Sequence, residues 1–130
     1  MIMRFDNFDW HDSILNSVII NRQNLGLNDI VELDITWPSG ERGILLFENV
    51  RKCIMDLNSG TDTKDWIYNA YETEDDEDFV SYKKQVENIC NDIDKLKCFV
   101  IETSTTGSLV KIFATQVIER LSDSPEKSLL

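Results

Sequence analysis

Hydrophobic and polar residues alternate most regularly between residues 30 and 37, and this alternation predicts a β-strand with one buried and one wet face. The positions expected to face inward are Val31, Leu33, Ile35 and Trp37. The sequence Pro-Ser-Gly at 38–40 is typical of a tight turn, and residues 43–48 are again mostly apolar. We therefore expect residues 30–48 to form a β-hairpin.

Apolar segments on either side of this hairpin predict further strands. Residues 14–21 are rich in β-branched side chains, and residues 50–57 form a mostly apolar run that ends at a turn sequence. Together with the hairpin they predict a meander of four strands. Residues 66–71 are aromatic and alternate with polar positions, which favours a strand but leaves a helical turn open.

A different periodicity appears at residues 79–93, where apolar side chains recur at steps of three and four and predict an amphipathic helix. The residues on this stripe are Phe79, Tyr82, Val86, Ile89 and Ile93. An acidic run at 72–78 precedes the helix and lies at the positive end of its dipole. Within the run, Asp76 or Asp78 is suited to cap the first turn.

The last part of the chain predicts two more strands and a tail. Residues 98–103 and 108–114 are expected to pair through a tight turn that ends at Gly107, in the left-handed conformation. Residues 112–121 are apolar enough to extend the second of these strands. Residues 122–130 are predicted to form a flexible C-terminal tail.

These elements predict a single α+β domain over residues 1–121. We expect a mostly antiparallel sheet of about six strands, with one main amphipathic helix packed on one face. A chain of 130 residues, 42% of them hydrophobic, can bury a core of its own without a disulfide or a metal.

The composition is strongly acidic, with 24 Asp and Glu residues against 13 Lys and Arg residues and a formal charge of −11. Such a chain repels nucleic-acid phosphates and anionic membrane surfaces, which argues against both as partners. It attracts a cation or a basic protein partner over a distance. The same charge could serve solubility alone, so composition leaves both interpretations open.

The cysteines and the start of the chain bear on the compartment. Cys53, Cys90 and Cys98 are widely spaced and form no Cys-x-x-Cys motif, so we expect free thiols in a reducing compartment rather than a metal or redox site. The first residues lack the apolar stretch of a signal peptide, and no apolar run is long enough to cross a membrane. The sequence therefore predicts a cytoplasmic protein without a cofactor.

His11 is the only histidine, and it stands in the sequence His11-Asp12-Ser13. These residue types make up a hydrolytic triad, but neighbouring side chains on an extended segment point to opposite faces. We therefore expect Asp12 and Ser13 to bond to local backbone, His11 to pack against Trp10 or Phe8, and no residue to be catalytic. The alternative is a small-ligand-binding or enzymatic domain with a pocket near His11 and the aromatic residues.

Two tyrosines stand just before and at the start of the acidic run, and aromatic anchors beside carboxylates suit a cationic protein partner. The residues expected to bind this partner are Tyr68, Tyr71, Glu72, Glu74, Asp75, Asp76, Glu77 and Asp78. The charges would speed association and the rings would supply affinity. The competing interpretation is that the run is only the solvated start of a helix.

Two stretches of the sequence resemble a known group of proteins. They are Trp10-His11-Asp12-Ser13-Ile14-Leu15, ahead of an alternating strand, and residues 103–112, with the sequence TSTTGSLVKI. This arrangement resembles the small bacterial α+β immunity proteins of polymorphic toxin systems. The resemblance implies a non-catalytic protein that binds and blocks a cognate toxin, which for this acidic chain would be a basic one. It transfers no site residue.

Overall fold

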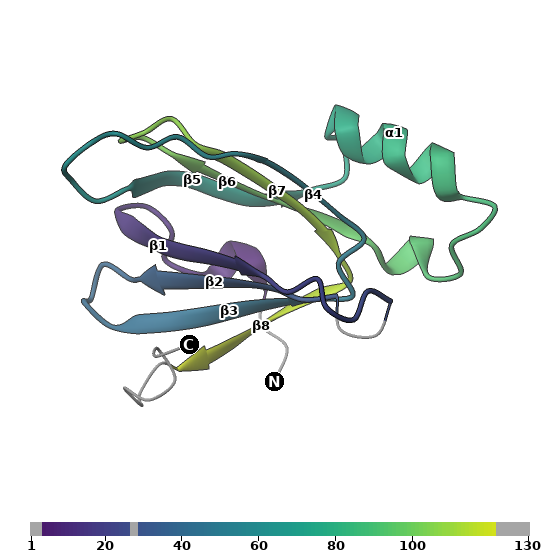
Figure 1. Ribbon diagram of the computed structural model, residues 1–130, viewed down its shortest axis with the longest axis horizontal. Helices are drawn as coiled ribbons and strands as arrows, with labels where there is room; N and C mark the ends of the chain where they lie inside the picture. Colours follow the sequence, from purple (N-terminus) through teal and green to yellow (C-terminus); the bar gives the residue numbers. More distant parts are fainter. Residues whose placement is uncertain (1–3, 27–28, 122–130) are drawn as a thin grey trace.

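In the computed structural model, which describes residues 4–26 and 29–121, eight strands form one antiparallel sheet that doubles back on itself (Figure 1). The strands are β1 (Ser13–Ile20), β2 (Val31–Thr36), β3 (Arg42–Glu48), β4 (Lys52–Asp56), β5 (Trp66–Thr73), β6 (Lys97–Thr103), β7 (Leu109–Ala114) and β8 (Gln116–Leu121). Among the described residues there is one α-helix, α1 (Glu77–Val86), and there are two short 3-10 helices, Phe5–Asn7 and Ile93–Lys95. The predicted α+β class and antiparallel sheet are confirmed, but the sheet has eight strands rather than about six.

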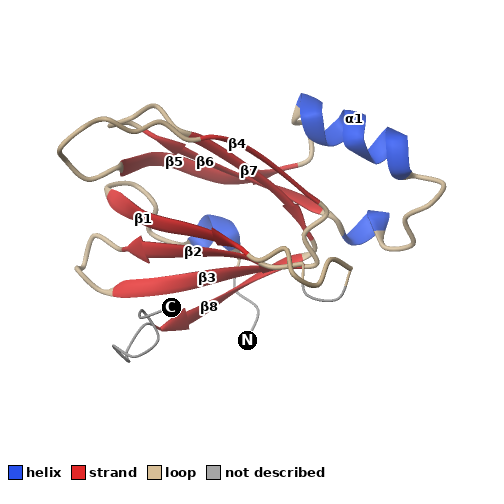
Figure 2. Cartoon of the chain, in the orientation of Figure 1, coloured by secondary structure: helices blue, strands red, loops and turns tan. Residues whose placement is uncertain are grey.

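The strand order β4-β7-β6-β5-β1-β2-β3-β8 divides the sheet into two layers. Strands β4, β7, β6 and β5 form one layer and β1, β2, β3 and β8 form the other, and Figure 2 shows the two sets of red strands one above the other. The layers are joined at one corner, where β1 pairs with β5 only through Ser13 and Ile14. Beyond this corner the two strands diverge, and side chains from both layers fill the space between them.

The principal core lies between these two layers, as in a β-sandwich. Its buried residues are Phe5, Trp10, Leu15, Val31, Leu33, Ile35, Leu45, Phe47, Ile67, Phe99, Ile101, Val110, Ile112, Ala114 and Val117. In β2, the positions predicted to face inward are buried, and Trp37 packs against the same cluster, so the predicted hairpin is confirmed. A helix does pack on one face of the sheet, as predicted, but the hydrophobic cluster beneath it is smaller than the core between the two layers.

Helix α1 lies beside the outer face of the layer that contains β6 and β7 (Figure 1). Its Phe79 side chain is fully buried in a second cluster with Cys98 and Val100 of β6 and Phe113 of β7. The rings of Phe79 and Phe113 meet edge to face with their centroids 5.1 Å apart. Asp76 caps the helix, one of the two predicted caps, because its carboxylate accepts a hydrogen bond of 3.0 Å from the backbone N–H of Phe79.

The helix is shorter than predicted, because it ends at Val86 instead of Ile93. Ile89, which was expected on the buried stripe, is 80% exposed, and Ile93 lies in the second 3-10 helix. The segment after Val86 is rich in Asn and Asp, whose side chains compete for backbone hydrogen bonds and favour turns over helix interiors. These residues end the helix although the apolar spacing continues.

Two strand predictions are wrong at points where the chain changes layer. After Glu48 the chain crosses to the other layer, so that β4 pairs with β7 and does not continue the meander. Residues 112–121 are not one strand, because β7 ends at Ala114 and β8 begins at Gln116 and pairs with β3. Between them, the N–H and the hydroxyl of Thr115 both donate to the Glu48 carbonyl and hold the two crossings together.

The β6–β7 connection forms as predicted. Gly107 has a φ of +70°, in the left-handed region that glycine adopts without strain. The backbone N–H and the hydroxyl of Thr106 both donate to the Asp65 carboxylate, which ties this turn to the segment before β5. The predicted tail at 122–130 lies outside the described residues.

Candidate functional site

The two predicted tyrosines lie on the same outward face of β5 because a β-bulge interrupts the strand. The register shifts between Ile67 and Asn69, so strict alternation is broken at Tyr68. Residues three apart in a regular strand point to opposite faces. Here Tyr68 and Tyr71 are both exposed, at 48% and 37%, and Tyr71 pairs with Val100 of the outer cluster. The bulge therefore brings the two rings to one side of the sheet.

Glu102, on β6, is the polar centre of this face. Its carboxylate oxygens accept hydrogen bonds from the side-chain amide of Asn69, at 3.0 Å, and from the hydroxyl of Tyr68, at 3.4 Å. Burial, followed by the charges of Glu102 and Asp76, raises the pKa of the Tyr71 hydroxyl above its ordinary value. Tyr71 therefore keeps its proton and can donate a hydrogen bond to a partner.

The acidic run meets this face at the start of α1. The ammonium of Lys111, on β7, lies 2.7 Å from the Asp76 carboxylate and 2.9 Å from that of Asp78. Glu102, on the neighbouring strand, adds a third carboxylate to this side of the sheet against the single ammonium of Lys111, so the surface keeps a negative charge. We call it the tyrosine–carboxylate face, and its residues are Tyr68, Asn69, Tyr71, Asp76, Asp78 and Glu102.

The other acidic residues of the predicted site do not join this face. Glu72 pairs with Phe99 on the inner side of β5, and its carboxylate lies 3.9 Å from the ammonium of Lys97. Glu74 and Asp75 are exposed in the loop before α1, and Glu77 is exposed in its first turn; these three complete the predicted set. The fold therefore divides the predicted segment instead of presenting it as one patch.

The His11-Asp12-Ser13 stretch forms the corner between the layers. Ser13 is fully buried and its hydroxyl donates to the carbonyl oxygen of Trp10, which is the kind of local backbone bond expected from the sequence. Asp12 has a φ of +68° at this turn. His11 does not pack against an aromatic neighbour as expected, but is exposed, with its Nδ1 3.3 Å from the carbonyl oxygen of Tyr68. The Ser13 hydroxyl is therefore not placed to react with His11 as its base.

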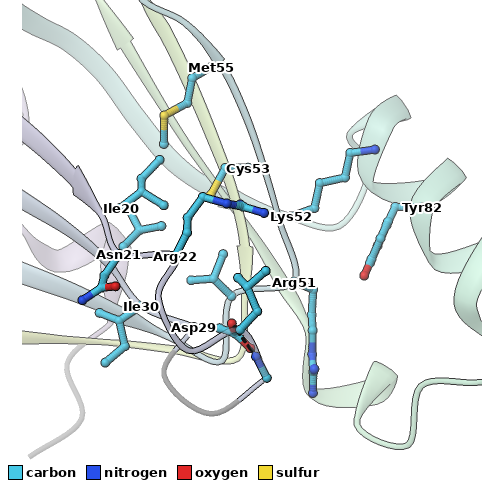
Figure 3. Close-up of a pocket in the computed structure, with 14 residues that line it drawn as sticks. Ile20, Asn21, Arg22, Asp29, Ile30, Arg51, Lys52, Cys53, Met55 and Tyr82 are labelled. Atoms are coloured by element: carbon cyan, nitrogen blue, oxygen red, sulfur yellow. Dashed lines mark hydrogen bonds between the residues drawn. The ribbon is translucent and has the colours of Figure 1, made fainter.

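A groove of about 720 Å³ lies between the end of β1 and the strand β4 (Figure 3). Among the described residues that line it, the basic ones are Arg22, Arg51 and Lys52, and the acidic one is Asp29, whose carboxylate accepts from the backbone N–H of Gly26. The apolar walls are formed by Ile20, Leu25, Ile30, Val31, Val50 and Met55. The groove is thus positively lined in a chain whose formal charge is −11.

The basic side chains reach the groove from separate segments. Figure 3 shows the Arg22 side chain beside Cys53 of β4. Burial raises the pKa of the Cys53 thiol to about 11, and the charge of Arg22 partly opposes this shift. The Lys52 ammonium lies 5.8 Å from the ring centroid of Tyr82 on α1. Arg51 donates to Asp92 at 2.8 Å. Cys53 keeps its proton at neutral pH and is a poor nucleophile, so the groove offers binding rather than thiol chemistry.

Sequence interpretation missed Glu102 and the basic groove for different reasons. Glu102 shares an alternating strand face with Cys98 and Val100, so a polar residue in that pattern was a local signal. The groove has no such signal, because Arg22 and Lys52 meet only when the chain crosses between layers.

No family model, curated protein or solved structure matches the chain. Within residues 4–26 and 29–121, no helix has the length and apolar character needed to cross a membrane. Over the same ranges, no three His, Cys, Asp or Glu side chains are grouped so that they could hold a metal ion.

Proposed function

We propose that the chain is a non-catalytic binding module that docks a basic partner protein on the tyrosine–carboxylate face. The observation that carries this proposal is the exposure of Tyr68 and Tyr71 on one side of β5, beside the carboxylate of Glu102. Rings of this kind supply contact area, and carboxylates around them steer the encounter with a cationic surface. An arginine of the partner could stack on a tyrosine and pair with Glu102 at the same time.

The position of the face in the fold supports this role. Strand β6 pairs with β5 on one side and with β7 on the other, and β5 pairs with β6 from Ile67 to Thr73, so the face is held in place before a partner arrives. A preformed surface loses less conformational entropy on binding than a flexible one. Trp66, at the start of β5, is also exposed, at 39%, and adds a third ring to this strand.

A stoichiometric inhibitor of a basic toxin, as the resemblance to immunity proteins implies, needs only such a surface and no reacting group. The competing function, a small-ligand or enzymatic site near His11, has less support. The Ser13 hydroxyl is occupied by a backbone carbonyl, and His11 does not line the groove between β1 and β4.

The test is affinity capture from cells that make the protein, with three immobilised baits and quantification by mass spectrometry. The baits are the wild type, a Tyr68→Ser/Tyr71→Ser/Glu102→Gln variant, and a matched control, Ile19→Ser/Leu57→Ser/Glu41→Gln, that changes exposed residues elsewhere. We expect a basic protein bound by the wild type and the control and reduced at least about tenfold by the first variant. Its association rate, measured by stopped flow, should fall as salt is added.

Two results would contradict the proposal. One is a partner that the first variant captures as well as the wild type does, because its contacts would then lie elsewhere. The other is an association rate that does not change with salt, because the carboxylates would then play no part in the encounter.

A further inference from the structure

The groove between β1 and β4 runs beside strand edges that lack a neighbour within the described residues. β4 stands at the end of the strand order and pairs only with β7. β1 pairs with β2 along its length but with β5 only through Ser13 and Ile14, so its second side is open from Asn16 to Ile20. An open edge presents backbone N–H and C=O groups that can hydrogen-bond to an added strand.

Exposed apolar side chains follow the groove beyond these edges. Ile20 is 43% exposed and Leu25 60% exposed at one end. A second hollow of about 500 Å³ continues past Arg51 and Tyr82, which line both, and reaches Ile89. A long, open groove with apolar side chains spaced along it suits an extended segment better than a compact small molecule.

The charged side chains that line the groove favour an occupant with negative charge. Arg22 and Lys52 make no ion pair with any residue in the described ranges. Arg51, which also lines the groove, is already paired with Asp92. A basic segment would be repelled here, whereas carboxylates would be attracted by Arg22 and Lys52.

We propose that this groove binds an extended acidic segment of a partner protein, which adds to β4 as a further strand. Alternate apolar side chains of the segment face the apolar walls, and its carboxylates meet Arg22 and Lys52. A second copy of this chain is a poorer occupant, because two copies carry the same net negative charge and would bring the same three cations together. The site is separate from the tyrosine–carboxylate face, so either proposal can fail without the other.

The probe is a fluorescein-labelled peptide of alternating Glu and Val with blocked ends, whose binding is followed by fluorescence anisotropy at low salt. One comparison peptide replaces Glu by Lys. Two others carry N-methyl groups on one or the other alternate set of amides, so that at least one cannot pair with an edge strand. We expect the Glu-Val peptide to bind at least about tenfold more tightly than the Lys-Val peptide and than one of the N-methylated peptides.

Matched protein variants locate the binding. Arg22→Glu/Lys52→Glu should weaken the Glu-Val peptide at least about tenfold. Arg4→Glu/Lys64→Glu makes the same change of charge at exposed residues outside the groove and should alter affinity less than about twofold.

Several results would overturn the proposal. They are no binding of the Glu-Val peptide, equal binding of the Lys-Val peptide, equal binding of both N-methylated peptides, and unchanged affinity in Arg22→Glu/Lys52→Glu. Sedimentation that shows a dimer dissociated by Lys52→Glu would overturn it too, because the edge of β4 would then be covered by a second copy.

Discussion

Trp37 and Glu119 are joined by a hydrogen bond of 2.9 Å from the indole nitrogen to a carboxylate oxygen, although 82 positions separate them in the sequence. Trp37 follows β2 and Glu119 lies in β8, so the two side chains reach each other across β3. A Cβ atom at Gly43 of β3 would overlap both the carboxylate and the indole nitrogen. The missing side chain at Gly43 is therefore what allows this bond to form.

Gly43→Ala should lower the free energy of unfolding by about 1–3 kcal/mol, because the new methyl group must displace one of the two partners. Chemical unfolding in urea measures the change. In a Glu119→Ala background the same substitution should cost less, since one of the overlapping groups has been removed. An equal cost in both backgrounds would mean that the methyl group meets some other obstacle.

Phe79→Ala should lower the free energy of unfolding by about 3–5 kcal/mol, because it removes the fully buried ring through which α1 packs on Phe113. Ile89→Ala is the matched control: this side chain is 80% exposed, so its removal should change stability by less than about 0.5 kcal/mol. Urea unfolding followed by far-ultraviolet circular dichroism compares the two. Similar costs would show that the helix is not held by Phe79.

The sequence predicted the local elements well where alternation and turn chemistry agree. In residues 30–48, the inward positions and the Pro-Ser-Gly turn both indicate a hairpin, and the hairpin forms. The crossings were not predictable in this way. The chain changes layer just before residues 50–57 and again within residues 112–121. Both segments are mostly apolar along their whole length, so their periodicity does not show which strand each of them pairs with.

The candidate site shows the same limit. The sequence predicts that Tyr68 and Tyr71 bind a partner together, but regular alternation would put them on opposite faces of β5. The bulge after Ile67 places both rings on the same face. A bulge depends on how β5 pairs with β6, and not on the residues of β5 alone. The sequence therefore names the two side chains but not the bulge that brings them to one face of the sheet.

Asp76→Asn should make the stability of the protein less sensitive to acid. Burial would raise the pKa of Asp76, but hydrogen bonds from Lys111 and from the backbone of Phe79 outweigh it and hold the pKa below its ordinary value. A carboxylate with a lowered pKa contributes stability above its unfolded pKa of about 3.9, and this is lost as pH falls through the lower folded value. Asparagine keeps the helix cap but carries no charge to lose.

The measurement compares urea midpoints at about pH 7 and about pH 3 for the wild type, Asp76→Asn and Asp75→Asn. We expect the wild type and Asp75→Asn to lose more stability on acidification than Asp76→Asn does. Asp75 is a fair control because it is exposed in the same loop and makes no ion pair with the residues that the structure describes. If all three proteins lose the same stability on acidification, Asp76 does not contribute to the effect of acid.

Asp92→Asn should speed the alkylation of Cys90. The Cys90 thiol donates to the Asp92 carboxylate at 3.0 Å, and this hydrogen bond is the main cause that raises the pKa of Cys90. Removal of the negative charge should lower that pKa and increase the thiolate fraction, which is the form that reacts. Arg51, released from Asp92, lowers the pKa of Cys90 further.

Iodoacetamide labelling at about pH 8, with peptide mapping by mass spectrometry, separates the three thiols of the same molecule. In Asp92→Asn, Cys90 should react several-fold faster than in the wild type, because a larger fraction of the thiol is ionised. Cys98 is the internal reference, because burial raises its pKa to about 12 and its side chain should stay buried, out of reach of the reagent, in the variant. Asp94→Asn removes the same charge from a neighbouring exposed residue and should leave Cys90 unchanged. If Cys90 reacts at one rate in all three proteins, its contact with Asp92 does not control the thiol, and access to the hollow beside Tyr82 becomes the better explanation.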